Sequence, residues 1–579
     1  MGRLETEGKE FLYDGKPLRI LSGAIHYFRV VPEYWRDRLL KLKACGLNTV
    51  ETYIPWNFHE EKEGQFNFEG ILDVCRFIEI AEELGIFVIV RPSPFICAEW
   101  EFGGLPAWLL EKGDIQLRCF DEYYLEKIDA YYDVLIEKLK PYLSTKGGPI
   151  IAMQVENEYG SYGNDKKYLN YLKEALIKRG VDVLLFTSDG SEDLMLQGGT
   201  LPDVLKTINF GSKPKENFNN LLNHQPDKPL MCMEYWNGWF DHWEEVHHSR
   251  AAKEVAADID AMLEMGANFN IYMFQGGTNF GFYNGANHSD IYEPTVTSYD
   301  YDALLTENGE PTEKFYRVRE VILKHYPENN NEMPPAIPKK AYGKVKLKSE
   351  GQLFKNLNNI SKASERPCPT SMEKLGQQYG FILYRTILNS TIGENCLSIM
   401  GLHDRAQVFL NGEYKGTLYR NNEKEKIKLG TIEDGAILDI LVENMGRVNY
   451  GPYLKDMKGI LGGVRLDYQF IHGWQIYTLP LDNIEKVEYK EIQHMKGPSF
   501  YKGTLIVDEL GDTFIELKGW IKGVVFINGF NIGRYWEKGP QRRLYVPAPL
   551  LKKGENEIVI FELYKAEEVE VEFYNTPSL

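Results

Sequence analysis

The sequence predicts an α/β protein whose first part is a (β/α)8 TIM barrel and whose second part is two all-β jelly-roll or β-sandwich domains. Short apolar runs alternate with helical periods over residues 20–325. A Pro- and Asn-rich stretch, PENNNEMPPAIPKK, then breaks the periodicity. Beyond it, strand-like runs recur at short spacing with turn signals. A chain of 579 residues is too long for a single core, which agrees with several domains.

Eight apolar strands, each followed by a helical stretch, carry the barrel prediction. The helical stretches YWRDRLLKLKACG and DVCRFIEIAEELG each end in glycine, as helices commonly do. Eight such repeats favour a closed (β/α)8 barrel. A doubly wound open sheet is the alternative, and the lack of GxGxxG at a strand–helix junction weakens it. The predicted strands cover residues 20–27, 48–53, 86–93, 150–155, 183–190, 206–211, 229–236 and 268–277.

The second part of the chain contains an internal echo. AQVFLNG at 406–412 matches GVVFING at 523–529, and each predicts a strand that ends in an Asn-Gly turn. Two sandwiches related by duplication explain this echo. The segment AYGKVKLK after the linker adds a strand to one sandwich or the other. The expected domains are a catalytic barrel at 1–328, a linker at 329–342, and sandwiches at 343–470 and 471–579.

Composition excludes several classes of function. The net charge of −18 argues against a nucleic-acid or anionic-membrane surface. The chain has no apolar run of about 18 residues and no run resembling a signal peptide, so we expect no membrane partner and a cytoplasmic location. The seven cysteines form no CxxC pair, and no His-rich cluster or phosphate loop occurs, so no metal and no cofactor are expected. Exposed sandwich faces leave a homodimer open.

The stretch GGPIIAMQVENEYG places two acids at the exit of the fourth predicted strand. Active sites of parallel α/β barrels lie at strand exits. Because side chains alternate along a strand, Glu156 and Glu158 are expected to share one side, and Asn157 to point away. For the motif alone, a pair of capping or salt-bridging acids explains the pattern equally well.

A third acid, Glu234, stands at the exit of the seventh strand in PLMCMEYW. Strands four and seven of a barrel cross the same small mouth, so Glu234 can face the acids of strand four. The other exits add aromatic and amide side chains. Carboxylates with aromatic walls and amide donors match glycoside hydrolysis, which needs an acid, a nucleophile or base, and a platform for a sugar ring.

Seven sequence blocks in one order then resemble glycoside hydrolase family 35, the β-galactosidases. The blocks are SGAIHYFR, NTVETYIPWNFHE, RPSPFICAEWEFGGLPAWLL, GGPIIAMQVENEYGSYG, MCMEYWNGWFDHW, FQGGTNFG and TSYDYDA. The likeness is greatest to bacterial members without secretion signals. It implies a catalytic barrel followed by β-sandwiches, the second being galactose-binding-like. Where the family often has RPGPY, this chain has RPSPF, which alters the support of the turn that follows.

The resemblance also implies a role for each site residue. Glu158 would be the general acid/base and Glu234 the nucleophile, and Asn157 would bind the sugar 2-OH. Cys97 is expected to offer its backbone, since no histidine accompanies it as a partner for a nucleophilic thiol. Loop 444–453 (NMGRVNYGPY) could cover the mouth, although a plain loop explains it as well. The other substrate-binding residues are Tyr53, Ala98, Glu99 and Tyr301 around the galactose hydroxyls, Trp239 as an aromatic wall, and Trp236 and Tyr450 on the leaving-group side.

The expected function is therefore that of a retaining exo-β-galactosidase. It would release terminal β-D-galactose from β-galactoside oligosaccharides by double displacement, and a preference for β-1,3 links is expected. A barrel glycosidase of other sugar specificity, such as a β-glucosidase or an exo-glucosaminidase, is the first alternative. The second is a carbohydrate-binding protein without catalytic activity.

Overall fold

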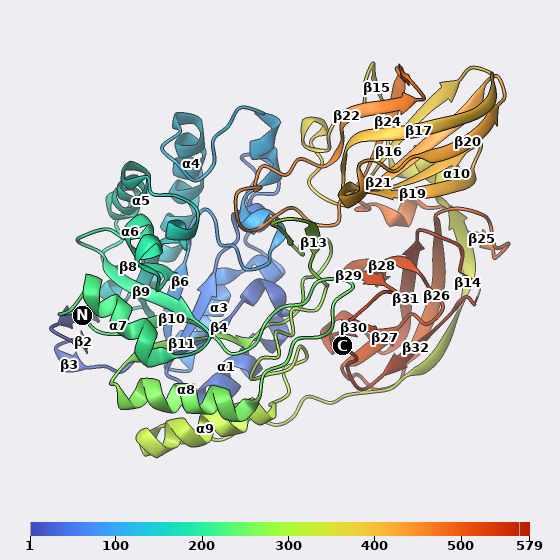
Figure 1. Ribbon diagram of the computed structural model, residues 1–579. Helices are drawn as coiled ribbons and strands as arrows, with labels where there is room; N and C mark the ends of the chain where they lie inside the picture. The colour runs from blue at the N-terminus through green and yellow to red at the C-terminus, as the bar shows by residue number, and fades with distance from the viewer. Residues whose placement is uncertain (1, 567) are drawn as a thin grey trace.

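A barrel and two β-sandwiches make up the molecule, and both sandwiches lie on the same side of the barrel (Figure 1). The computed structural model describes residues 2–566 and 568–579. Within these residues, no helix combines the length and the apolar character that a membrane crossing requires. The class predicted from the sequence, a TIM barrel followed by all-β domains, is confirmed.

The barrel is closed, and its eight strands are parallel neighbours in chain order, with β11 pairing back to β4. All eight predicted strands are present, displaced by at most a few residues at their ends. Their runs are apolar because the strands are covered on both faces, by the barrel interior and by the helices. The strands are β4 (Leu21–Ile25), β5 (Thr49–Tyr53), β6 (Phe87–Arg91), β7 (Ile150–Asn157), β8 (Leu184–Gly190), β9 (Leu205–Phe210), β10 (Met231–Trp236) and β11 (Asn268–Gln275).

Helices surround the barrel and bury their apolar faces against it. Several begin with a capping side chain: Asp73 accepts a hydrogen bond from the amide of Arg76, and Asp121 from that of Tyr124. The helices are α1 (Trp35–Ala44), α2 (Trp56–His59), α3 (Val74–Glu83), α4 (Glu122–Leu139), α5 (Lys166–Lys178), α6 (Asp193–Gly199), α7 (Pro214–His224), α8 (Ala252–Glu264) and α9 (Glu313–His325), with α10 (Leu353–Ile360) beyond the barrel.

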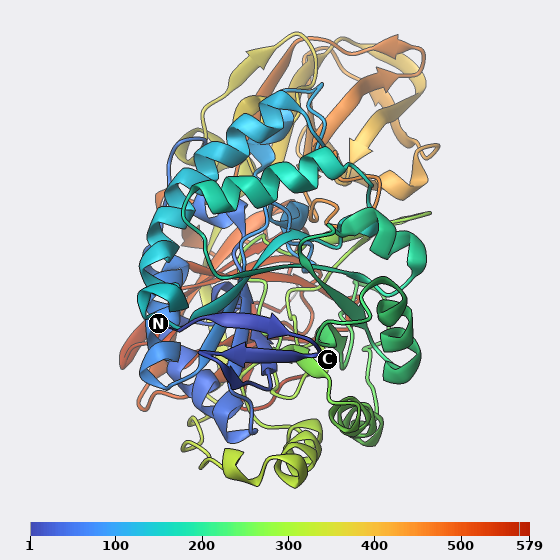
Figure 2. The same cartoon turned by 90° about the vertical axis from the view of Figure 1, so that its left-hand side faces the viewer.

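A small sheet closes the end of the barrel that lies away from the sandwiches. It consists of β1 (Leu4–Glu7), β2 (Glu10–Tyr13) and β3 (Lys16–Pro17). Its Leu4 and Phe11 pack with barrel residues such as Ile151 and Met233 in one apolar cluster. Figure 2 looks onto this end, with the strands of the small sheet in front. The opposite end, where the strands exit, is therefore the open one and faces the sandwiches.

The first sandwich packs a six-stranded sheet against a four-stranded sheet. Residues of both sheets, among them Ile382 and Leu438 of the larger and Leu397 and Val464 of the smaller, share one apolar core. The strands are β15 (Ser364–Arg366), β16 (Phe381–Leu388), β17 (Thr391–His403), β18 (Arg405–Leu410), β19 (Glu413–Tyr419), β20 (Ile427–Ile432), β21 (Ala436–Glu443), β22 (Gly459–Leu466), β23 (Gln469–Phe470) and β24 (Trp474–Leu479).

The C-terminal sandwich is a single nine-stranded sheet whose two halves join along β14 and enclose an apolar core. Its last strand, β32, pairs with β14 on one edge and with β27 on the other, so this strand is an interior strand of the sheet. The strands are β14 (Gly343–Gln352), β25 (Lys490–Glu491), β26 (Ser499–Val507), β27 (Thr513–Glu516), β28 (Lys522–Ile527), β29 (Phe530–Trp536), β30 (Arg543–Val546), β31 (Gly554–Glu562) and β32 (Glu570–Tyr574).

Strand pairing differs from the sandwich boundaries expected at residues 343 and 471. Strand β14 lies within the range expected for the first sandwich, although its sandwich was left open, and it pairs with β26 and β32 of the C-terminal one. Strand β24, expected in the second sandwich, pairs with β15 and β16 of the first. The first sandwich is thus inserted between β14 and the rest of the C-terminal sheet. A strand pattern shows which residues alternate but not which distant strand they pair with, so linear boundaries missed both exchanges.

The predicted echo corresponds to two matching hairpins, β18–β19 and β28–β29. Asn411 and Asn528 have φ of 51° and 50°, and each is followed by a glycine with positive φ, as the predicted Asn-Gly turn requires. Each asparagine side chain accepts a hydrogen bond from the strand that neighbours its hairpin in the sheet. The donor to Asn411 is the amide of Ile437 on β21, and the donor to Asn528 is the amide of Glu557 on β31. Both hairpins also shift register after Val408 or Val525. These shared details agree with duplication.

Buried charges fasten the first sandwich to the barrel mouth. Arg447 forms ion pairs with Glu101 of the barrel and with Glu373 of the sandwich, and all three side chains are buried. Val448 forms an isolated bridge with Ala286, at the start of the hairpin β12 (Ala286–His288) and β13 (Tyr292–Pro294). Loop 444–453 is thereby held against the open end of the barrel.

Candidate active site

A cavity of about 250 Å³ lies at the open end of the barrel, where the strands exit. All eleven residues that the sequence nominated for catalysis or substrate binding line it. Its walls come from the barrel strands, from the loops that follow them, and from loop 444–453 of the first sandwich. The lining residues are Tyr53, Ile96, Cys97, Ala98, Glu99, Asn157, Glu158, Glu234, Trp236, Trp239, Phe240, Tyr272, Asn287, Tyr301 and Tyr450.

Glu234 forms an ion pair with Arg91 and accepts hydrogen bonds from Tyr53 and Trp236. Arg91 Nη1 lies 2.7 Å from Oε1, the Tyr53 hydroxyl donates to the same oxygen at 2.6 Å, and Trp236 Nε1 donates to Oε2 at 3.1 Å. The pairing of β10 with both of its neighbours is irregular just before this residue, between Cys232 and Glu234 or Tyr235. Met233 lies in the barrel interior, so in a regular strand the next residue, Glu234, would point outward. The irregularity breaks this alternation, and Glu234 faces the cavity.

Asn157 is fixed in the same network. Its Oδ1 accepts a hydrogen bond from Arg91 Nη2 at 2.7 Å, and it lies 2.8 Å from the Tyr53 hydroxyl, whose single proton is shared between Asn157 and Glu234. Its Nδ2 donates to the backbone carbonyl of Ile96 at 3.2 Å. The amide is buried and held at both ends, so its position at the cavity wall is set before any substrate binds.

Glu158 occupies a different electrostatic environment from Glu234. It follows the last residue of β7 in the left-handed conformation, with φ of 46°, and its amide donates to Ser188 O at 2.9 Å. Asn209 Nδ2 donates to Glu158 Oε1 at 3.0 Å. Burial and the nearby charge of Glu234 raise the pKa of Glu158 to about 8. At neutral pH the carboxyl group is therefore protonated.

Glu156 points away from the cavity, contrary to the expectation that it shares a side with Glu158. It forms a buried bidentate pair with Arg118, with Nε to Oε1 at 3.0 Å and Nη2 to Oε2 at 2.9 Å. The β7–β8 pairing shifts register between Gln154 and Asn157, and this irregularity breaks the alternation. The side-chain periodicity of a regular strand therefore failed at this strand end.

The turn Cys97–Ala98–Glu99 has three consecutive residues in the left-handed region, with φ of 58°, 56° and 46°. Such residues are strained when they are not glycine, and the strain concentrates at functional sites. Glu99 accepts a hydrogen bond from the Tyr299 hydroxyl at 2.5 Å, and burial raises its pKa to about 7. Burial raises the pKa of the Cys97 thiol well above its usual value, which argues against a nucleophilic role.

Aromatic rings form the outer wall. Trp239 is 40% exposed, and its ring centroid lies 5.7 Å from that of Trp236 and 6.4 Å from that of Tyr301. Tyr450 reaches the cavity from loop 444–453, whose Asn449 donates to Cys97 Sγ at 3.5 Å. Loop 444–453 therefore does cover part of the mouth.

Several residues of this site were not nominated from the sequence. Ile96, Phe240, Tyr272 and Asn287 line the cavity, and Asn209 contacts Glu158. Asn209 lies two residues before the end of the predicted strand KTINFG (206–211), and a polar residue near that strand exit was the signal that could have revealed it. Asn287 belongs to the β12–β13 hairpin, which has no counterpart among the barrel repeats and left no comparable signal.

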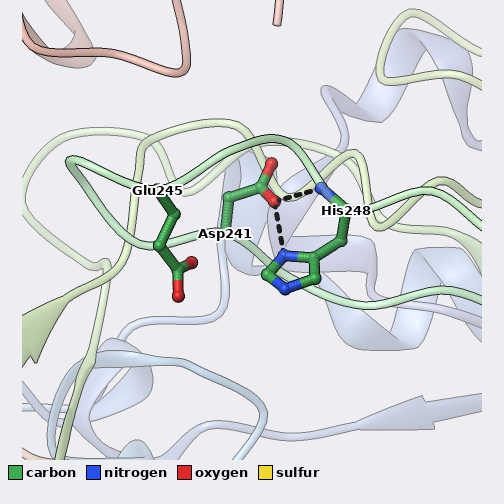
Figure 3. Close-up of side chains that lie close together, drawn as sticks. All are labelled: Asp241, Glu245 and His248. Atoms are coloured by element: carbon green, nitrogen blue, oxygen red, sulfur yellow. Dashed lines mark hydrogen bonds and ion pairs between the residues drawn. The ribbon is translucent and has the colours of Figure 1, made fainter.

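Beside the cavity, the loop after β10 carries a cluster of acids and histidines. Asp241, Glu245 and His248 lie together there, with Asp241 between the other two in the view of Figure 3. Asp241 Oδ1 lies 2.9 Å from His248 Nδ1, and Oδ2 lies 2.7 Å from His247 Nδ1. Burial raises the pKa of Asp241, but the two histidines outweigh it and lower that pKa. These contacts join Asp241 to two histidines farther along the loop that carries Trp239.

Comparison with known families agrees with this geometry. The family model for glycosyl hydrolases family 35 matches residues 10–325. The chain belongs to glycosyl hydrolase family 35. Two further models match downstream of the family 35 barrel: "Beta-galactosidase, first all-beta domain" at 369–480 and "Beta-galactosidase, galactose-binding domain" at 498–556. The first of these matches ends just after β24, as the strand pairing does.

Relatives of this family 35 chain include animal and plant proteins. "Beta-galactosidase" of Bos taurus is 43% identical over 97% of this chain and 91% of its own. "Beta-galactosidase-1-like protein 3" of Rattus norvegicus is 42% identical over 95% and 88%, and "Beta-galactosidase 17" of Arabidopsis thaliana is 42% identical over 96% and 86%. These eukaryotic relatives do not support the expected likeness to bacterial members without secretion signals.

Proposed function

We propose that this family 35 enzyme is a retaining exo-β-galactosidase. Its substrates are oligosaccharides that carry β-D-galactose at the non-reducing end. The observation that supports this most directly is the contrast between two carboxyl groups in one cavity. Glu234 faces Arg91 and Tyr53, whereas burial keeps Glu158 protonated. A carboxyl group paired with an arginine, next to a second carboxyl group whose pKa is raised, is the combination that a glycosidase needs.

In the first step, Glu234 attacks the anomeric carbon while Glu158 gives its proton to the leaving oxygen. The glycosidic C–O bond breaks as the ester bond to Glu234 forms, and the aglycone leaves with the proton. Asn157, held by Arg91 and Tyr53, is placed to bind the sugar 2-OH, a contact that strengthens in the transition state.

In the second step, Glu158 acts as the base. Esterification removes the charge of Glu234, and that charge is one cause of the raised pKa of Glu158. The pKa of Glu158 therefore falls in the intermediate, and the carboxylate can take a proton from water. The water oxygen attacks the anomeric carbon, the ester bond breaks, and galactose leaves with its original anomeric configuration.

The cavity supports exo action on short substrates. Its volume of about 250 Å³ is below the ~300–1,000 Å³ usual for ligand pockets, which suits one sugar ring. The proposed galactose specificity rests on relatives whose names are "Beta-galactosidase" and "Beta-galactosidase 17". Trp236 and Tyr450 both line the cavity, and we propose that they narrow its outer part and thereby favour β-1,3 links. Product analysis on β-1,3-, β-1,4- and β-1,6-galactosyl disaccharides, with aryl glucosides and glucosaminides as controls, tests both proposals.

Two variants test the roles of the acids. Glu234→Gly should abolish turnover, and azide should restore it with formation of the α-galactosyl azide. Glu158→Ala should keep formation of the galactosyl-enzyme from a dinitrophenyl galactoside but lose activity on disaccharides. Equal loss on both substrates would contradict the role of Glu158, and a β-azide product from Glu234→Gly would contradict that of Glu234.

Cellular location and assembly are proposed from the sequence alone. A cytoplasmic location is tested by cell fractionation, and a homodimer by light scattering of the purified protein. All seven cysteines are free thiols.

A further inference from the structure

Asn209 connects the two sides of the active site. It lies on β9, directly beside Glu234 of β10 in the strand register, while its side chain reaches Glu158 at the end of β7. The Asn209 side chain is buried and does not line the cavity. Its contact is therefore with the acid/base and not with the space for substrate.

The orientation of the Asn209 amide is fixed from β8. The hydroxyl of Ser188, which is fully buried, donates to Asn209 Oδ1 at 2.6 Å. With Oδ1 held by Ser188, Nδ2 points to Glu158 and donates to its Oε1 at 3.0 Å. The backbone carbonyl of the same Ser188 accepts the Glu158 amide at 2.9 Å. Ser188 thus positions both the backbone of Glu158 and the donor that faces its side chain.

We propose that Asn209, oriented by Ser188, is a positioning residue that directs the catalytic proton of Glu158 to Oε2 and stabilises the Glu158 carboxylate in the second step. Oε1 accepts a hydrogen bond from an amide N–H, and a proton on Oε1 would make this oxygen a poorer acceptor and weaken that bond. Oε2 is the oxygen left for the proton that the leaving group receives. This inference rests on the proposed role of Glu158 as acid/base.

The chemistry of a double displacement explains why such a donor is useful. Burial and the charge of Glu234 raise the pKa of Glu158, whereas the Asn209 contact lowers it. Without the donor, the pKa of Glu158 would be higher still, so the carboxyl group would stay protonated before the first step but would release its proton less readily in either step. A neutral amide gives this stabilisation in both steps because it adds no charge of its own.

Several other groups act on the ionisation of Glu158. Asp189 of β8 is buried, its Oδ1 accepts the amide of Gly160 at 2.8 Å, and burial raises its pKa to about 7. Because both Asp189 and Glu158 can ionise above neutral pH, the test below compares variants instead of interpreting the wild-type profile alone. The titratable or charged groups that face Glu158 are Arg91, Cys97, Asp189, Glu234, Tyr301 and Tyr450.

The test is the pH dependence of kcat/KM on a galactosyl disaccharide, whose leaving group needs the acid. Asn209→Leu should move the alkaline limb up by ~1 pH unit, the size expected when a carboxylate loses one hydrogen bond. Asn209→Asp keeps the shape, adds a like charge, and should move the limb at least as far. Ser188→Ala should produce a smaller shift in the same direction.

The matched control is Asn268→Leu. Asn268 is another buried barrel asparagine whose amide bonds only backbone groups, those of Ile20 and Leu230, at the other end of the strands. Its variant should leave the alkaline limb in place. An unmoved limb in both Asn209 variants, or an equal shift in Asn268→Leu, would overturn the inference.

Glu158→Ala, run in the same series, separates this inference from the proposed function. If Glu158→Ala removes the alkaline limb and spares the dinitrophenyl galactoside while the Asn209 variants leave the limb unmoved, only the inference fails. If Glu158→Ala keeps the limb, the role of Glu158 itself fails. The near-isosteric Asn209→Asp gives a result even if Asn209→Leu does not fold.

Discussion

Arg447 gives the sharpest test of how the first sandwich is joined to the barrel. Its guanidinium contacts the carboxylates of Glu101 and Glu373, with Nε 3.1 Å from Glu373 Oε1. None of the three residues is more than 2% exposed. Arg447→Met therefore leaves two buried carboxylates without their cation. Breaking a buried pair in this way costs ~3–5 kcal/mol, since the charge that remains is neither solvated nor paired.

The measurement is urea denaturation followed by tryptophan fluorescence, at pH 7 and at pH 5. The loss in free energy of unfolding should be ~3–5 kcal/mol at pH 7. It should be smaller at pH 5, where the unpaired carboxyl groups can take up protons. Adding Glu101→Gln and Glu373→Gln to Arg447→Met should recover most of the stability, because no buried charge then remains.

A matched control is Arg76→Met, which removes the exposed pairs of Arg76 with Glu79 and Glu83. Water already screens these charges, so the unfolding transition should stay at the wild-type urea concentration. The reasoning is refuted if Arg447→Met loses less than ~1 kcal/mol at pH 7, or if the triple variant is no more stable than the single one.

Three further predictions concern the cavity and its support. The pKa of Glu158 is about 8 in the folded protein and ~4.3 in an unfolded chain. The folded state therefore binds more protons between these values, and its stability falls as the pH rises through this window. Glu158→Gln should raise the Tm over wild type at pH 8, and this gain should shrink toward pH 5. Because we propose that Tyr450 lies on the leaving-group side, Tyr450→Ala should raise KM for disaccharides several-fold and leave kcat/KM for a dinitrophenyl galactoside nearly unchanged; equal effects on both substrates would contradict this. Glu156→Gln breaks the buried pair with Arg118 and should lower unfolding free energy by ~3 kcal/mol without moving the pH profile of kcat/KM; a moved profile would place Glu156 in the chemistry.

The barrel could be predicted from the sequence because its information is local. Each strand is a short apolar run, and each run is followed by a helical period, so element type and order follow from neighbouring residues. The eight strands therefore appear where the periodicity put them. The sandwiches are different because their sheets pair strands far apart in the chain, such as β14 with β32 and β15 with β24. Nothing in the pattern of β14 distinguishes one partner sheet from the other.

The site shows the same division. Glu158 and Glu234 could be nominated because each acid ends an apolar strand, where burial alone gives no reason for a charge. The partners that set their protonation are less visible: Arg91 and Asn209 come from other strands, and each contact depends on barrel closure. The roles of Glu156 and Asn157 depend on an irregularity in β7 that periodicity cannot show.

The ion pair between Glu101 and Arg447 bears on how freely the parts of this protein can be exchanged. Glu101 belongs to the barrel, its counter-charge belongs to the sandwich, and the same loop delivers Tyr450 to the cavity. A barrel grafted onto a foreign sandwich would lose a counter-charge and one wall of its substrate pocket together. We therefore expect residues 101, 373 and 447 to vary together among family members. Recombination between family members should succeed only when the crossover points keep the barrel and the first sandwich from one parent.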